Sequence, residues 1–149
     1  MALGITMRAR AAGADQVLFA PGGSVQETGA SNFMLLDDAR LVTKALDGSF
    51  LVGVTRDSVL ALAREPGYRV EERDITVDEL FTWAAEGEVA LVGTAAVMAG
   101  VGSFLHDGNS VQLRDGTVGP NTQRLRQALI AVQRGQAPDR WGWTNPVEQ

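Results

Sequence analysis

Two glycine-threonine segments are the residues of this 149-residue chain best suited to hold an anion. Gly53-Val54-Thr55 stands at the start of an expected helix, and Gly93-Thr94-Ala95-Ala96 follows an apolar expected strand. A helix N-terminus leaves backbone N–H groups unpaired and carries a partial positive charge, so a phosphate can bind there. Glycine lets a ligand approach the backbone closely, and a threonine hydroxyl can add a hydrogen bond. The spacing therefore indicates two candidate phosphate-holding loops.

Each of these signals also has a plain structural explanation. Thr55 can be the N-cap of its helix, which is a commoner role than phosphate binding. The Gly93–Ala96 segment can be a small-residue turn between two buried strands. Glu27 stands at an expected strand end beside a Gly-Ala-Ser turn, where it is either an exposed acid or a pocket acid. Arg56 and Asp57 are interpreted as a surface ion pair in the first turn of the helix.

Composition excludes several classes of site. The sequence has no cysteine and one histidine, His106, so disulfides, thiol nucleophiles and histidine-rich metal sites are excluded and no metal is expected. The net charge of -5 argues against nucleic-acid binding. The sequence contains no run of eighteen or more apolar residues, so no membrane span is expected. Arg8 and Arg10 follow the first apolar residues, the reverse of a secretory signal, so a cytoplasmic location is expected.

Periodicity and turn residues predict one domain over residues 1–149 with alternating helices and strands. Helices are expected at residues 3–12, from Thr55 to Pro66, from Thr76 to Glu86, and from Pro120 to Gly135. Strands are expected at residues 16–20, 25–27, 32–37, 41–43, 68–74, 89–92 and 97–101, with hairpin turns at 106–109 and 114–116. Residues 137–149 are expected to be an extended tail laid over the domain by Trp141 and Trp143.

The order of these signals resembles the signature of class IV aminotransferases, the pyridoxal phosphate (PLP) fold type IV group of branched-chain and D-amino-acid enzymes. The matching positions are Glu27, Gly29, Asn32, Phe33, Leu41-Val42-Thr43, Leu51, Gly53, Val54 and Arg56. Three later segments resemble branched-chain aminotransferases in the same order: GTAAV, GPNTQRL and RWGWT. The resemblance implies an α/β (α+β) pseudo-barrel domain like the large domain of these enzymes.

The resemblance also implies roles for individual residues around PLP. Glu27 would face the pyridine nitrogen, where a carboxylate keeps the ring protonated, and it is the candidate acid or base. Leu51 would pack on the ring. Val54 and Thr55 would bind the phosphate from one side.

The second loop would complete the site from the other side. Gly93 and Thr94 would bind the phosphate there. The turn at Thr94 and Ala95 would offer N–H groups to a substrate carboxylate. These residues complete the anion-binding set that the resemblance implies.

The sequence departs from the family pattern where the chemistry is done. The family's Schiff-base lysine lies upstream of the glutamate in a segment of the form KxGGNY, and this chain begins with Met1-Ala2-Leu3-Gly4, just past that segment. By the same comparison the family's small domain is expected to be missing, and Met34 stands where the signature prefers Phe or Tyr. Lys44, the one lysine, follows Thr43 where the family usually has proline, so it is not expected to replace the lost lysine.

Transamination uses that lysine both as a covalent anchor and to move a proton. The chain is therefore expected to be a diverged enzyme that needs no cofactor. It would catalyse cyclisation, isomerisation or proton transfer on a small carboxylate or enolate through Glu27. The alternative is a truncated fragment or inactive partner of a PLP-dependent branched-chain aminotransferase, which binds PLP non-covalently if at all. A homodimer is expected in either case, because loss of the small domain exposes an apolar face.

Overall fold

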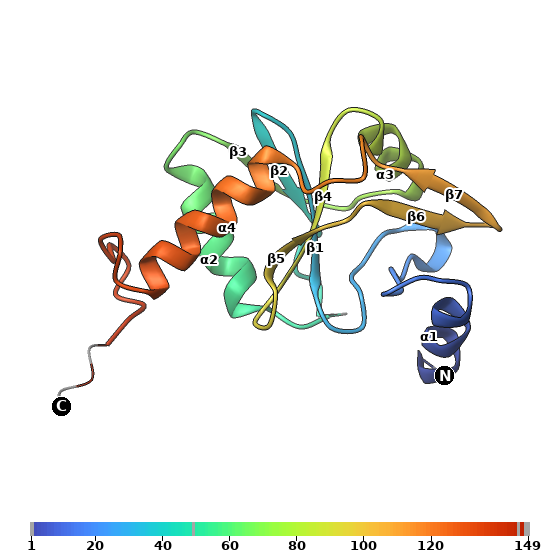
Figure 1. The fold of residues 1–149 in the computed structure, drawn as a ribbon, viewed down its shortest axis with the longest axis horizontal. Helices are drawn as coiled ribbons and strands as arrows, with labels where there is room; N and C mark the ends of the chain where they lie inside the picture. The colour runs from blue at the N-terminus through green and yellow to red at the C-terminus, as the bar shows by residue number, and fades with distance from the viewer. Residues whose placement is uncertain (1, 49, 146, 148–149) are drawn as a thin grey trace.

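The computed structural model describes residues 2–48, 50–145 and 147, and it has the predicted mixed α/β fold (Figure 1). A five-stranded sheet has the order β3-β2-β1-β4-β5, and β6 and β7 form a separate hairpin. The strands are β1 Asn32–Leu36, β2 Arg40–Thr43, β3 Arg69–Glu72, β4 Glu88–Gly93, β5 Val97–Gly100, β6 Ser103–His106 and β7 Asn109–Gln112. The helices are α1 Ala2–Ala11, a short 3-10 helix Pro21–Gly23, α2 Val54–Arg64, α3 Val77–Ala84 and α4 Pro120–Gln133.

The central strand β1 is buried on both faces of the sheet. Its alternate residues Met34 and Leu36 belong to one apolar cluster, and Phe33 and Leu35 belong to another. This division follows from the alternation of side chains along a strand. Helices α2 and α4 cover the first face, and α3 packs on the second, as Figure 1 shows. The uninterrupted apolar run of β1 is typical of a strand covered on both sides.

Strand pairing brings several chain segments to one end of the sheet. β1 is antiparallel to β4, with Asn32 opposite Val92, and antiparallel to β2, with Met34 opposite Thr43. β2 and β3 are parallel, and the connection between them contains α2. The start of β1, the ends of β2 and β4, and the segment leading into α2 therefore lie at the same end of the sheet.

Two predicted strands are wrong, and one predicted hairpin is confirmed. Residues 16–20 and 25–27 form no strands, and the contact between them is limited to hydrogen bonds from Phe19 N to Glu27 O at 3.0 Å and from Gln26 N to Phe19 O at 2.8 Å beside an isolated Leu18–Thr28 bridge. The intervening Pro21-Gly22-Gly23 forms a 3-10 turn with positive φ at both glycines, so the two segments separate after a few contacts. The β6–β7 hairpin turns at Asp107 and Gly108, both with positive φ, as a tight Asp-Gly turn requires.

The predicted turn at residues 114–116 is present but joins no pair of strands. Gly116 N donates to Leu113 O at 2.8 Å, and the chain continues toward α4. The Asp-Gly pair has the composition of a hairpin turn, but a hairpin also needs a strand after the turn, and among the described residues none follows here.

Thr76 caps α3 as predicted, because its side chain accepts a hydrogen bond from Glu79 N at 3.1 Å.

The tail contains a compact turn held by Asp139. Its carboxylate accepts hydrogen bonds from Trp141 N at 3.1 Å and from Thr144 N and Oγ1 at 2.7 and 2.9 Å. Trp141 and Trp143 stack with ring centroids 4.4 Å apart and pack against the cluster under α2 and α4. Burial acts to raise the pKa of Asp139, but the amides of Thr144, Trp143 and Trp141 and the Thr144 hydroxyl lower it to about 2.

The substitution Asp139→Asn is expected to abolish the near-UV circular dichroism of the tryptophan pair at pH 7 while far-UV signal stays unchanged. An amide accepts through one oxygen only, so it leaves several of these donors unpaired. Because the pKa of Asp139 in the folded protein lies below the ordinary aspartate value of 3.8, its stabilisation of the wild-type protein is complete above that value and is lost as pH falls toward 2.

The exposed Asp115 offers a matched control, since it holds its own turn through Thr117. Asp115→Asn is expected to leave the tryptophan signal unchanged. An unaltered signal in Asp139→Asn would show that the aromatic packing alone holds the tail.

Candidate functional site

Both glycine-threonine segments flank the first residues of β1. A Cβ at Gly53 would lie 2.2 Å from Asn32 Oδ1, so the segment before α2 passes directly against that side chain. A Cβ at Gly93 would lie 3.4 Å from both Ala30 O and Ser31 Oγ. Folding thus brings residues forty positions apart to neighbouring places on one strand end.

Glu27 is connected to the same strand end by its hydrogen bonds. Asn32 Nδ2 donates to Glu27 Oε2 at 3.0 Å and to Leu51 O at 3.1 Å. Burial raises the pKa of the Glu27 carboxyl, while hydrogen bonds from the Leu51 backbone and the Asn32 side chain act to lower it. Glu27 is half-buried, and its carboxyl group holds a proton more readily than a solvated glutamate does.

Helix α2 begins differently from the prediction. The N-cap is Gly53, with an extended backbone, and Thr55 lies inside the first turn, so its prediction as the cap is wrong. Among the described residues, no side chain caps this helix. Its first N–H groups are therefore left for solvent or a ligand, which is the arrangement that favours anion binding.

Arg56 is buried, so its interpretation as half of a surface ion pair is wrong. The side chain is 2% exposed, and Nη2 donates to Lys44 O at 3.0 Å and to Glu72 Oε2 at 2.9 Å. Its Nε is buried without a hydrogen-bond partner in the part of the chain that the structure describes. Helix periodicity turns Arg56 inward beneath the end of β2, while Asp57 stays exposed.

The second segment forms the turn between β4 and β5. Gly93 pairs with Val97, and Thr94, Ala95 and Ala96 are exposed between them. Val97 has φ of +60°, a left-handed conformation that is strained for a β-branched residue.

The surface around these residues is open and apolar. Leu51, Val52 and Val54 are 77%, 59% and 83% exposed. The prediction that Leu51 packs on a ring and Val54 beside a phosphate is compatible with this exposure, which leaves room for a ligand. Both roles stay predictions.

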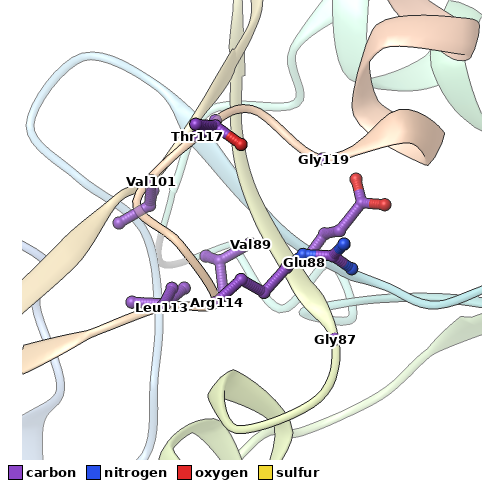
Figure 2. A pocket seen from close by; sticks show the side chains of 9 residues that line it. Gly87, Glu88, Val89, Val101, Leu113, Arg114, Thr117 and Gly119 are labelled. Atoms are coloured by element: carbon purple, nitrogen blue, oxygen red, sulfur yellow. The ribbon is translucent and has the colours of Figure 1, made fainter.

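Two hollows in the described part of the chain lie away from these residues. A cleft of about 10 Å³, the room for about one water molecule, is lined by Glu88, Arg114 and Gly119 (Figure 2). A shallow groove of about 540 Å³ runs between α2 and α4 beside Leu62 and Arg140. Glu88 begins β4 and Gly93 ends it, so the first cleft lies at the opposite end of that strand.

Lys44 has its amine engaged by two acids. Nζ hydrogen-bonds Asp74 and lies 2.9 Å from Asp47 Oδ2, and the side chain is largely buried. The hydrogen bond to Asp74, followed by that to Asp47, raises the pKa of the amine. A protonated, ion-paired amine is a poor nucleophile, because nucleophilic attack requires the neutral form.

Sequence reasoning missed the polar group that anchors α4. Glu88 is 3% exposed, and its carboxylate accepts hydrogen bonds from the backbone and side chains of Asn121 and Thr122 at 2.8–2.9 Å. Figure 2 shows this side chain directed toward Gly119. A helix that begins with Gly119-Pro120 has no side-chain cap of its own, and that signal predicts an acid from elsewhere.

Within the described ranges, no cluster of His, Asp and Glu side chains could hold a metal ion. Among the helices of that part of the chain, none has the length and apolar character needed to cross a membrane.

Comparison with known proteins agrees with this arrangement. Residues 5–104 match the family described as amino-transferase class IV. The probable branched-chain-amino-acid aminotransferase of Streptomyces coelicolor is 41% identical over 145 residues, which are 93% of this chain and 40% of that protein. The chain spans about 40% of the length of such curated relatives.

Solved structures give the same result. The branched-chain amino acid aminotransferase of Escherichia coli superposes with a TM-score of 0.84 at 32% identity, covering 99% of this chain and 48% of that one. The enzyme of Thermobaculum terrenum in its PLP form superposes with a TM-score of 0.76 at 30% identity, covering 89% of this chain and 41% of that one. The chain therefore belongs to the class IV aminotransferase family and is similar to less than half of a branched-chain aminotransferase.

Proposed function

We propose that this chain forms the part of a branched-chain aminotransferase-like protein that receives the phosphate and the pyridine ring of PLP, without a covalent bond. One observation carries the proposal: the Asn32 side chain, at the start of β1, contacts both Glu27 and the Leu51–Gly53 segment. The Thermobaculum terrenum relative, whose structure is of the PLP form, supports the choice of ligand.

The phosphate end fits the uncapped start of α2. Free N–H groups at Val54 and Thr55 would receive the phosphate oxygens, and the Thr55 hydroxyl would add a donor. Gly53 leaves the backbone open to close approach. Gly93 and Thr94 would close the phosphate from the β4–β5 side, since Gly93 abuts the same strand end.

The ring end fits Glu27. Glu27 is half-buried, and its carboxylate would accept a hydrogen bond from a protonated pyridine nitrogen, which stabilises the proton on the ring. When bound, PLP supplies an electron sink, and a protonated ring nitrogen strengthens it. The Leu51 backbone hydrogen-bonds Glu27, and the exposed Leu51 side chain would cover one ring face.

The amine needed for transamination is not supplied by the residues described here. Lys44 is the one lysine of the sequence, and it is held by Asp74 and Asp47. The Thr94–Ala95 turn would still bind a substrate carboxylate through its N–H groups. Non-covalent retention of the cofactor follows from this arrangement.

PLP titration followed by absorbance is expected to show saturable binding, and borohydride reduction is expected to leave the protein mass unchanged. Borohydride fixes only a cofactor bonded to an amine. Thr55→Val is expected to weaken PLP binding about tenfold, because one hydrogen bond to a charged phosphate is lost. The measurement is the dissociation constant with intact-protein mass spectrometry.

Thr82→Val is the matched control, since Thr82 is exposed on α3 and its hydroxyl donates to Asp78 O. Its PLP affinity should equal that of the wild-type protein. A reduced adduct on Lys44 would overturn non-covalent binding, and absence of saturable binding would overturn the proposal itself.

The raised pKa of Glu27 favours a second candidate function, a proton transfer that needs no lysine. Its substrate would be a small carboxylate or enolate held at the Thr94–Ala95 turn. Turnover without added PLP that is lost in Glu27→Gln would support this candidate over the first. A homodimer and a cytoplasmic location stay predictions from the sequence under both.

A further inference from the structure

We propose that Asn32 is a positioning residue that joins the ring end and the phosphate end of this site into one binding unit. The inference rests on the proposed function and deepens it, because it assigns the recognition of a two-ended ligand to a single side chain. Asn32 would touch neither end of that ligand. It acts through Glu27 and through the Leu51–Gly53 segment.

Every polar atom of the Asn32 side chain faces one of these two parts. Nδ2 has two N–H groups, and its two acceptors are Glu27 Oε2 at 3.0 Å and Leu51 O at 3.1 Å. Oδ1 faces Gly53, where a Cβ would lie only 2.2 Å away. One amide therefore connects the acid to the segment that leads into α2.

The backbone of Asn32 is fixed as well. The residue is 6% exposed, begins β1 and pairs with Val92 of β4, one residue before Gly93. A buried side chain with both donors engaged has little freedom to change rotamer. Asn32 thus sets the acid and the helix entry relative to the strand that also carries the second loop.

Few other residue types satisfy this geometry. Aspartate has the same shape but no N–H group, so it would oppose both Glu27 and the Leu51 carbonyl. Alanine removes the connection and leaves both acceptors without their donor. Glutamine places its amide one methylene further out, where the space beside Gly53 is already filled.

Connecting the two ends matters only for a ligand that reaches both. PLP carries its pyridine nitrogen and its phosphate on a rigid ring, so once one end binds, the other is presented at high effective concentration. This gain requires the two protein parts to keep their relative position. Inorganic phosphate reaches only the phosphate end of the site, at the start of α2 and the β4–β5 turn. It does not reach Glu27, so its binding does not need the connection between the acid and the helix entry.

The test compares Asn32→Ala and Asn32→Asp with the wild-type protein through two dissociation constants, for PLP and for inorganic phosphate. PLP affinity is expected to fall at least tenfold in both variants, and phosphate affinity to change less than threefold. Asn145→Ala, an exposed amide in the tail, is the control and should change neither constant.

A second measurement needs no ligand. Carboxyl NMR of the free protein is expected to show the pKa of Glu27 raised in both variants, because a donor to the charged carboxylate is lost. A residue that only supports the local fold would weaken PLP and phosphate equally and leave the Glu27 titration in place. Thermal unfolding identifies any variant that does not fold. The test of Asn32 then rests on the variant that does fold.

The outcomes separate this inference from the proposed function. Equal losses for PLP and phosphate, or an unchanged Glu27 pKa, would overturn the role of Asn32 even if PLP binds to the wild-type protein. If the wild-type protein binds no PLP, the proposed function fails. In that case a raised Glu27 pKa in the variants still supports positioning of the acid, and an unchanged one overturns it.

Discussion

Glu88→Ala is expected to lower the free energy of unfolding by about 3 kcal/mol, because each buried donor left without an acceptor costs about 1–3 kcal/mol. The carboxylate receives four donors from Asn121 and Thr122 at the start of α4. Removing it leaves these donors unpaired and also removes a negative charge from a helix N-terminus. For a chain of this size the melting temperature should fall by roughly 6–12 °C, as measured by differential scanning calorimetry.

Glu86→Ala is the matched control, because Glu86 is an exposed glutamate two residues earlier. It should change the unfolding free energy by less than about 0.5 kcal/mol. Glu88→Gln should fall between the two, since an amide keeps one acceptor oxygen but loses the charge. A Glu88→Ala protein as stable as the control would mean that water replaces the carboxylate at the start of α4.

Local patterns were sufficient where a segment's own residues determine its structure. Thr76 and Glu79 marked the start of α3, and Pro120 the start of α4, because cap and breaker chemistry acts within a few residues. The apolar run of β4 also predicted its burial. The mixed α/β fold follows from these elements.

Local patterns failed where distant residues decide. Arg56 looks like half of an exposed pair with its neighbour, yet its partners are the Lys44 carbonyl and Glu72, which only the β2–α2–β3 crossover brings near. Thr55 has the chemistry of a cap, but the extended backbone at Gly53 starts the helix earlier. In both cases tertiary structure overrides a local preference.

In the candidate site, too, the sequence predicted some features and missed those that depend on distant residues. Chain order and family resemblance identified Glu27 and both glycine-threonine segments. They did not reveal that Asn32 connects them, because a side chain that donates to residues five and nineteen positions away leaves no periodic signal. Glu88 is similar, since its partners lie more than thirty residues further along the chain.

Gly53→Ala is expected to reduce PLP affinity at least tenfold while lowering the free energy of unfolding by about 1 kcal/mol. The backbone at Gly53 has φ of -73° and ψ of 128°, which alanine adopts without strain. The whole effect therefore comes from the new Cβ, which would lie 2.2 Å from Asn32 Oδ1 and force that amide to rotate. Rotation breaks the hydrogen bonds to Glu27 and Leu51 at a cost of about 1 kcal/mol net.

The matched control is Gly4→Ala, because a Cβ at Gly4 in α1 would meet no atom within 4 Å. Alanine is the better helix former there, so stability should rise by up to about 1 kcal/mol with PLP affinity unchanged. Isothermal titration and chemical denaturation measure the two quantities. If Gly53→Ala kept wild-type PLP affinity, the segment before α2 would have to move as a body without disturbing the ligand. The rigid connection between the acid and the helix entry would then be wrong, whatever the ligand.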